Sequence, residues 1–174
     1  PMPASAGEVV LTLKQLREHF HYDPLTGHWT RLRACGPHLP GSKVGAAVRD
    51  REGHRYNILV FNGARYKMSR LAVFYMRGAW PTGVVDHRNG NTVDDAWKNL
   101  RDCSRKQNSQ NRRLNANSRS RHKGVQWNSR RGRWVALIRV NGKRLFLGYF
   151  EDPAAGALAY KAAALKHFGE FARA

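Results

Sequence analysis

Residues 112–121 (RRLNANSRSR) are polar and basic and contain almost no apolar side chains. A segment of this composition cannot bury enough apolar surface to join a core, so we expect a linker at 112–120. The apolar residues before and after it follow different patterns. We therefore expect an α+β protein with two small modules, at 9–111 and 121–172, each with its own core.

The charge balance indicates a polyanionic partner. Lys and Arg total 31, Asp and Glu total 12, and the formal net charge is +19. The segment 101–145 carries fourteen Lys or Arg residues and one acidic residue, Asp102. Nucleic acid is the first candidate to neutralise this charge, and a membrane surface is the second. We expect most of these cations to contact phosphate and only a few to read bases.

A membrane partner is not favoured by the sequence. No apolar run approaches the ~20 residues that a membrane span needs, and the N-terminal PMPASAGEVV lacks the pattern of a signal peptide. Two cysteines, Cys35 and Cys103, cannot build a disulfide framework or a four-cysteine zinc ribbon. We expect free thiols in a reducing compartment.

The first part of the chain predicts short helices and a small antiparallel sheet. The spacing of Val9, Leu13, Leu16 and Phe20 predicts a helix over 9–20. A turn follows, opened by Asp23-Pro24 and closed by Gly27, and then a strand at 28–33. Asn62-Gly63 lies between two strand-like runs within 43–67 and predicts a hairpin. Ser69 and Gly78 are expected to cap a helix over 69–78.

The second part predicts three strands and a helix. Strands are expected at 123–128, 133–140 and 143–150, with Asn141-Gly142 as the second turn. Asp152-Pro153 is expected to start a helix that Gly169 ends. Leu158, Ala162 and Leu165 recur along one face of this Ala-rich helix, which can lie close on a sheet.

Residues 84–111 contain the side chains needed for phosphodiester hydrolysis. We expect a strand, a loop, a strand and a short helix capped by Ser104 to bring Asp86, His87, Asn99 and Asn108 together. Asp86 and Asn108 offer oxygen ligands to a hard cation such as Mg²⁺. His87 can act as general base, with the Asn99 side chain or a nearby backbone oxygen holding its tautomer.

The same stretch resembles the HNH motif of phage and intron-encoded homing endonucleases, through its VDH, NLR and QNxxN segments. The segment 20–80 shares YDPxTG, KVG and RLAxxYxxG with that group. The resemblance implies a ββα-metal nuclease module with a small antiparallel sheet. It implies Asp86 and Asn108 as metal ligands, His87 as the water-activating base and Asn99 as the residue that orients it. The implied cofactor is Mg²⁺, with Mn²⁺ as the alternative and no zinc.

Two positions depart from this family. Relatives often carry His before the RLA segment, where Ser69 stands here, and cleavage is expected to be weaker if that His contacts DNA or supports the site. The family motif also tends to show Asp-Asn where this chain has Asp94-Asp95. Asp95 is not expected to be a metal ligand, so the difference affects only whether the residue at this position holds the loop in place.

Residues 121–172 resemble the Apetala-type (ethylene-response-factor) DNA-binding domain, through KGVxW, RWVAxIR, GKRxxLGYF and AxAYxxAAxxxFG. The resemblance implies a βββα module whose sheet lies in the major groove. Leu137 stands where plant members often have Glu, so a base contact through that carboxylate is absent. Arg130 and Arg133 lie in a hairpin one residue longer than the plant form. The residues expected at DNA are Lys123, Gln126, Asn128, Arg130, Arg133, Arg139, Arg144 and Phe146, together with Arg112, Arg113, Arg119 and Arg121.

We therefore expect a metal-dependent endonuclease that acts on double-stranded DNA, in the cytoplasm of a bacterial or phage-infected host. One active site per chain predicts nicking by a monomer, although the sequence leaves the oligomeric state open. The alternative is a non-catalytic DNA-binding regulator with a vestigial nuclease site. An RNA-binding protein has no recognisable stacking motif in its favour.

Overall fold

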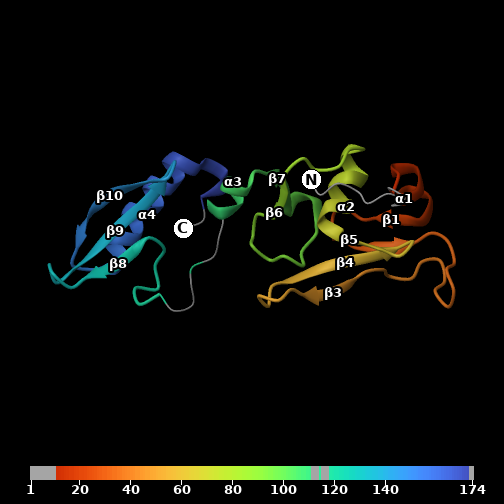
Figure 1. The fold of residues 1–174 in the computed structure, drawn as a ribbon, viewed down its shortest axis with the longest axis horizontal. Coiled ribbons are helices and arrows are strands. Elements are labelled where there is room, and N and C mark those ends of the chain that lie inside the picture. Colours follow the sequence, from red (N-terminus) through yellow and green to blue (C-terminus); the bar gives the residue numbers. More distant parts are fainter. Residues whose placement is uncertain (1–10, 111–113, 115–117, 173–174) are drawn as a thin grey trace. The chain divides into compact units, whose positions relative to one another are not determined.

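The structure is a computed structural model that describes residues 11–110, 114 and 118–172. Its contacts divide the chain into two units, the first ending at Asp102 and the second beginning at Cys103 (Figure 1). The fold is mixed α/β with small antiparallel sheets, as expected. The predicted module limits remain predictions, and the linker predicted at 112–120 lies for the most part outside the described residues.

The first unit begins with helix α1, Leu13–His19. Thr12 and Gln15 form a capping box: each side chain accepts a hydrogen bond from the backbone N–H of the other, at 3.2 and 3.0 Å. The helix predicted over 9–20 is wrong at its C-terminal end, because Phe20 is extended and begins strand β1, Phe20–Tyr22. Val9 lies outside the described residues.

Strands β1 and β2 (Trp29–Arg31) pair antiparallel around the predicted turn. The Asp23 carboxylate accepts hydrogen bonds from the Leu25 N–H at 2.9 Å and the Thr26 hydroxyl at 2.6 Å. Gly27 closes the turn with a φ of +75°. Side-chain hydrogen bonds of this kind are why Asp is favoured in turns.

A three-stranded antiparallel sheet follows, in the order β3 (Ala46–Arg49), β4 (Arg55–Phe61) and β5 (Ala64–Lys67). Asn62 and Gly63 join β4 to β5 with φ values of 49° and 77°. Two positive φ values match the twist of a tight hairpin, so the predicted hairpin is confirmed.

Helix α2, Met68–Arg77, ends at Gly78 as predicted, with φ at +75°. The prediction that Ser69 caps its start is wrong: Lys67 is the N-cap residue, and Ser69 lies buried in the first turn. The core of the first unit joins α2 to α1, β1, β2 and β4. Its large members are Leu16, Phe20, Tyr22, Trp29, Leu59, Leu71 and Phe74.

Strand β6, Val84–His87, pairs with β7, Leu100–Cys103. The loop between them ends in a short 3-10 helix, η1, Trp97–Asn99. This loop lies against the β1–β2 turn, where the Trp97 N–H donates to the Pro24 carbonyl at 2.9 Å. A Cβ at Gly27 would clash with the carbonyl carbon of Asp95, so the turn and the loop meet backbone to backbone.

The second unit contains helix α3 (Arg105–Gln110) and an antiparallel sheet in the order β10-β9-β8. The strands are β8 (Val125–Asn128), β9 (Arg133–Val140) and β10 (Lys143–Phe150). Helix α4 (Pro153–Phe168) packs along the sheet and is followed by the 3-10 helix η2, Gly169–Phe171 (Figure 1).

The face of α4 that meets the sheet differs from the expectation. Asp152 caps the helix as predicted, accepting from the Ala154 N–H at 3.0 Å. Leu158 and Leu165, however, are 69% and 56% exposed. The buried residues are Gly156, Tyr160 and Ala164. Two small residues let the helix approach the sheet closely, and the leucines point away from it.

Cys35 and Cys103 do not form a disulfide in the structure; Cys35 is exposed and Cys103 is buried. None of the helices in the described ranges is both long enough and apolar enough to cross a lipid bilayer.

We expect Gly27→Ala to destabilise the protein more than Gly53→Ala, a matched control. Both glycines have positive φ, +75° and +85°, but a Cβ at Gly53 meets nothing within 4 Å. Alanine at positive φ costs about 1 kcal/mol at either position. The clash with the Asp95 backbone should add about 1–3 kcal/mol at Gly27 only. Urea denaturation followed by circular dichroism measures both losses, and equal losses would contradict the close approach.

Candidate active site and basic sheet surface

Strand β6 delivers two adjacent polar side chains into the interior of the first unit. Asp86 and His87 end the strand and are only 6% and 7% exposed. Adjacent strand residues point to opposite faces, so the two side chains meet different surroundings. Buried ionisable groups of this kind need hydrogen-bonding partners. Asp86 has Arg101 as a partner, and His87 has Asp95.

The partner of Asp86 is Arg101 on β7. The Arg101 Nε and Nη2 atoms both donate to Asp86 Oδ2, at 2.8 and 2.7 Å. Both side chains are buried, so the guanidinium balances the carboxylate charge within the first unit itself. Sequence reasoning did not single out Arg101, although it belongs to the NLR segment.

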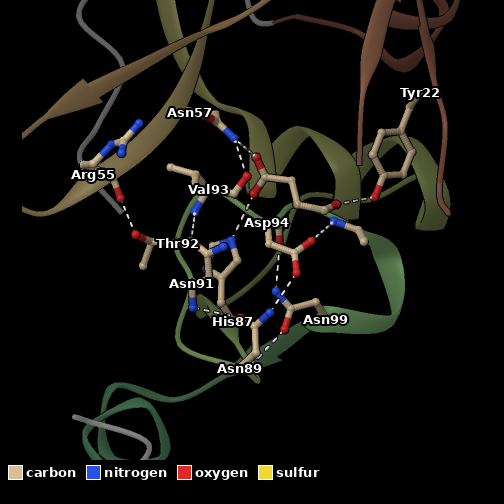
Figure 2. A network of polar contacts seen from close by, with 12 residues as sticks. Tyr22, Arg55, Asn57, His87, Asn89, Asn91, Thr92, Val93, Asp94 and Asn99 are labelled. Atoms are coloured by element: carbon tan, nitrogen blue, oxygen red, sulfur yellow. Dashed lines mark hydrogen bonds and ion pairs between the residues drawn. The ribbon is translucent and has the colours of Figure 1, made fainter. Parts of the chain in front are cut away.

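The predicted residue Asn99 ties together the two ends of the loop between β6 and β7 (Figure 2). Its Oδ1 accepts from the Asn89 N–H at 3.0 Å, and its Nδ2 donates to the Asp94 carbonyl at 2.7 Å. Its own carbonyl accepts from the Arg88 N–H at 2.8 Å. Asn99 thus fixes the backbone directly after His87.

A carboxylate lies at the imidazole of His87. The Asp95 Oδ1 atom lies 3.0 Å from His87 Nε2, and Asp95 is 2% exposed. The other oxygen, Oδ2, accepts from Asn57 Nδ2 on β4 at 2.8 Å. The sequence did not predict this contact, although Asp95 was one of the two positions that depart from the family motif.

The backbone of Asp95 is held from the N-terminal side of the unit. The Tyr22 hydroxyl on β1 donates to the Asp95 carbonyl at 2.7 Å (Figure 2). Burial raises the pKa of Tyr22 well above its ordinary value, and the nearby negative charge of Asp95 adds to the rise. The hydroxyl therefore stays protonated and remains a donor. Thr92 fixes the loop further by donating to the Arg55 carbonyl.

The fourth predicted residue, Asn108, lies on α3 in the second unit. Ser104 caps this helix as expected, since its hydroxyl accepts from the Gln107 N–H at 3.2 Å. Asn108 is half-buried, and its role as a ligand stays a prediction. The first unit therefore brings together Asp86, His87 and Asn99, and Asn108 belongs to the other unit.

The donor chemistry of Asp86 and Asn108 suits a hard divalent cation. One carboxylate and one amide oxygen resemble the small protein share of a Mg²⁺ site, where phosphate and water complete the shell. Among the described residues there is no group of three or more His, Cys, Asp and Glu side chains that could hold a metal ion. A site made of the Asp86 carboxylate and the Asn108 amide would not form such a group, because it has only one acidic residue and asparagine is not one of these residue types.

In the second unit, one face of the sheet carries six of the twelve residues predicted to contact DNA. Residues paired across strands share a face. Arg139 pairs with Arg144, Leu137 with Phe146, and Arg133 with Asn128. Helix α4 covers the opposite face, where Ile138, Tyr160 and Ala164 form a buried cluster. We call the uncovered face the basic sheet surface; its members are Gln126, Asn128, Arg133, Leu137, Arg139, Arg144 and Phe146.

An open pocket of about 590 Å³ lies beside the basic sheet surface and is lined in part by Gln126, Arg139 and Arg144. Arg119 and Lys123 also line it, which adds two cations. Arg121 and Arg130 are exposed elsewhere in the unit. The predicted contacts Arg112 and Arg113 lie outside the described residues.

The candidate active site lies in a segment that is similar to known proteins. Residues 66–110 match the model of the family described as HNH endonuclease. A stretch of 68 residues is 35% identical to Protein 3.8 of Escherichia phage T7, covering 38% of this chain and 56% of that protein. The solved structure "DNA binding and cleavage by the HNH homing endonuclease I-HmuI" is 18% identical, with a TM-score of 0.43 and coverage of 91% of this chain and 90% of that one.

The matched segment 66–110 contains all four predicted site residues, Asp86, His87, Asn99 and Asn108. This segment is therefore similar to an HNH endonuclease domain, in agreement with the HNH motif predicted for 84–111. The chain spans about half the length of the phage T7 protein. The resemblance of 121–172 to an Apetala-type domain stays a prediction.

Proposed function

We propose that this protein is a metal-dependent endonuclease that hydrolyses phosphodiester bonds in duplex DNA. The observation that carries the proposal is the HNH match over 66–110, within which His87 is buried at the end of β6 against Asp95. One such site lies in the described part of the chain, so a monomer is expected to make single-strand nicks. The expected products are 5′-phosphate and 3′-hydroxyl ends.

His87 acts as the general base. It takes a proton from a water molecule as the water oxygen forms a bond to phosphorus. The bond from phosphorus to the 3′ oxygen breaks, and that oxygen keeps the electron pair and takes a proton from solvent. Asn99 supports this step by fixing the backbone that follows His87.

Asp86 and Asn108 would hold the divalent cation, Mg²⁺ or Mn²⁺. When bound, the cation polarises the scissile phosphate and stabilises the charge on the leaving oxygen. Arg101 orients the Asp86 carboxylate by donating twice to Oδ2.

The second unit grips double-stranded DNA through the basic sheet surface. Arg139 and Arg144 lie side by side on it, and Phe146 is 57% exposed next to them. Arginine suits both phosphate and guanine. The adjacent cations Arg119 and Lys123 add sequence-independent affinity.

The second candidate is a DNA-binding regulator with a vestigial nuclease site. The ion pair between Asp86 and Arg101 favours it, because the guanidinium already satisfies one carboxylate oxygen. Ser69, in place of the usual histidine, points the same way. Whether Mg²⁺ or Mn²⁺ makes the purified protein cut plasmid separates the two candidates.

We expect His87→Ala to lower plasmid nicking by about 10²–10⁴-fold, the usual contribution of a general base. DNA affinity should be unchanged, because His87 is buried and the cations proposed to bind DNA lie in the second unit. Relaxation of supercoiled plasmid with Mg²⁺ measures the rate, and gel shift measures binding. His38→Ala, in an exposed loop, is the matched control and should cut like wild type. Equal cutting by His87→Ala would exclude His87 as the base.

We expect DNA affinity to fall steeply with salt, because phosphate contacts release counterions. Replacing both Arg139 and Arg144 by Ala should lower the slope of log K against log salt by about 2. Replacing Lys161 and Lys166 on the exposed side of α4 removes the same charge and should change the slope less. Fluorescence anisotropy over a salt series measures both. Identical slopes for the two double variants would contradict binding through the basic sheet surface.

A further inference from the structure

The hydrogen bonds around Asp95 determine which nitrogen of His87 carries the proton. Asp95 Oδ1 lies 3.0 Å from His87 Nε2, and Oδ2 accepts from Asn57 Nδ2 at 2.8 Å. An ionised carboxylate can only accept hydrogen bonds. Nε2 must therefore be the protonated nitrogen. In the neutral ring, the lone pair then lies on Nδ1.

Asn57 cannot reverse its amide to relax this requirement. Its Nδ2 donates to the Val93 carbonyl at 2.9 Å as well as to Asp95 Oδ2 (Figure 2). Turning the amide over would place its oxygen against a carbonyl and a carboxylate. Position 95 therefore faces two fixed donors, one from the ring of His87 and one from Asn57.

Only a carboxylate has two acceptors at this position. An asparagine, as the family motif tends to show here, would offer one oxygen and one NH₂ group. One of the two donors would then face another donor. The ring of His87 can remove that conflict by moving its proton to Nδ1, so that Nε2 accepts from the new amide.

The backbone of Asp95 is anchored, so the carboxylate can leave His87 only by changing its own rotamer and giving up the hydrogen bond from Asn57. Tyr22 donates to its carbonyl at 2.7 Å, and the Gly27 backbone lies directly against it. The anchors come from strand β1 and from the β1–β2 turn, far from the loop in sequence. The carboxylate thus has a fixed position at Nε2.

We infer that Asp95 is a positioning residue for the nuclease reaction, holding His87 in the Nε2–H tautomer so that Nδ1 is the atom that takes the proton from water. The inference rests on the proposed function for its effect on cleavage. The tautomer itself is a property of the folded protein and does not depend on activity.

The test uses the full chain as wild type, as Asp95→Asn and as Asp50→Asn. Asp50 lies in the exposed turn between β3 and β4, so its variant makes the same change in charge away from His87. Nicking of supercoiled plasmid at saturating DNA gives the turnover rate, and anisotropy gives affinity. Long-range ¹H–¹⁵N spectra of ¹⁵N-histidine-labelled protein show which ring nitrogen of His87 is protonated.

We expect Asp95→Asn to cut at least about 10²-fold more slowly, with unchanged affinity and with the His87 proton moved to Nδ1. Asp50→Asn should match wild type in all three measurements. Adding Asn57→Asp to Asp95→Asn exchanges the carboxylate and the amide between the two positions; the Val93 carbonyl loses its donor, which costs stability but leaves the contact with His87 matched. The carboxylate introduced at position 57 would accept from the amide NH₂ at position 95, and the amide oxygen would accept from Nε2. This double variant should recover part of the rate and the Nε2–H signal, even if each single change costs stability.

An Nδ1–H signal in wild type would overturn the inference whether or not the protein cuts DNA. Unchanged cutting by Asp95→Asn would overturn it while the nuclease function stands. An inactive wild type with a clear Nε2–H signal would instead overturn the proposed function and leave the assigned tautomer in place.

Discussion

The contact between the Asp95 carboxylate and the His87 imidazole is the interaction on which the candidate active site depends. Both groups are almost fully buried, so neither can rely on water for its hydrogen bonds. A buried carboxylate is stable only with donors at its oxygens, and here those donors are His87 and Asn57. The ring orientation of His87 therefore follows from the packing of strand β4 as much as from its own strand.

This dependence explains why the segments before the HNH motif belong to the same unit. Tyr22 and the turn that Gly27 closes hold the backbone at Asp95, and α2 completes the core beneath them. Asn99 holds the other end of the same loop. The loop that carries Asp95 is thus fixed at several points, which is the kind of support that a preorganised base requires.

The local elements could be predicted from the sequence where a residue's own chemistry decides the structure. Asn62-Gly63, Gly78, Ser104 and Asp152 each act locally, and the structure agrees with all four. The predictions failed where packing at a distance decides. Ser69 is buried in its helix and does not cap it, and α4 turns small residues and Tyr160, not its leucines, toward the sheet.

The candidate site shows the same division. Asp86, His87, Asn99 and Asn108 follow from a spacing that can be recognised in one stretch of sequence. Arg101 and Asn57 do not, because a pairing between strands and a contact from a different sheet bring them to the site. In the sequence, Asp95 stood out only as a departure from the family motif. Its contacts with His87 and Asn57 are seen only in the folded structure.

Crystals of the full chain grown with Mn²⁺ and a duplex DNA would test most directly whether Asp86 and Asn108 hold one cation. Anomalous scattering from manganese marks the cation without reference to any assumed site. We expect a single strong peak within bonding distance of an Asp86 carboxylate oxygen and the Asn108 side-chain oxygen, beside a DNA phosphate. A cation that contacts only one of these residues, or that lies elsewhere on the chain, would contradict hydrolysis at this site.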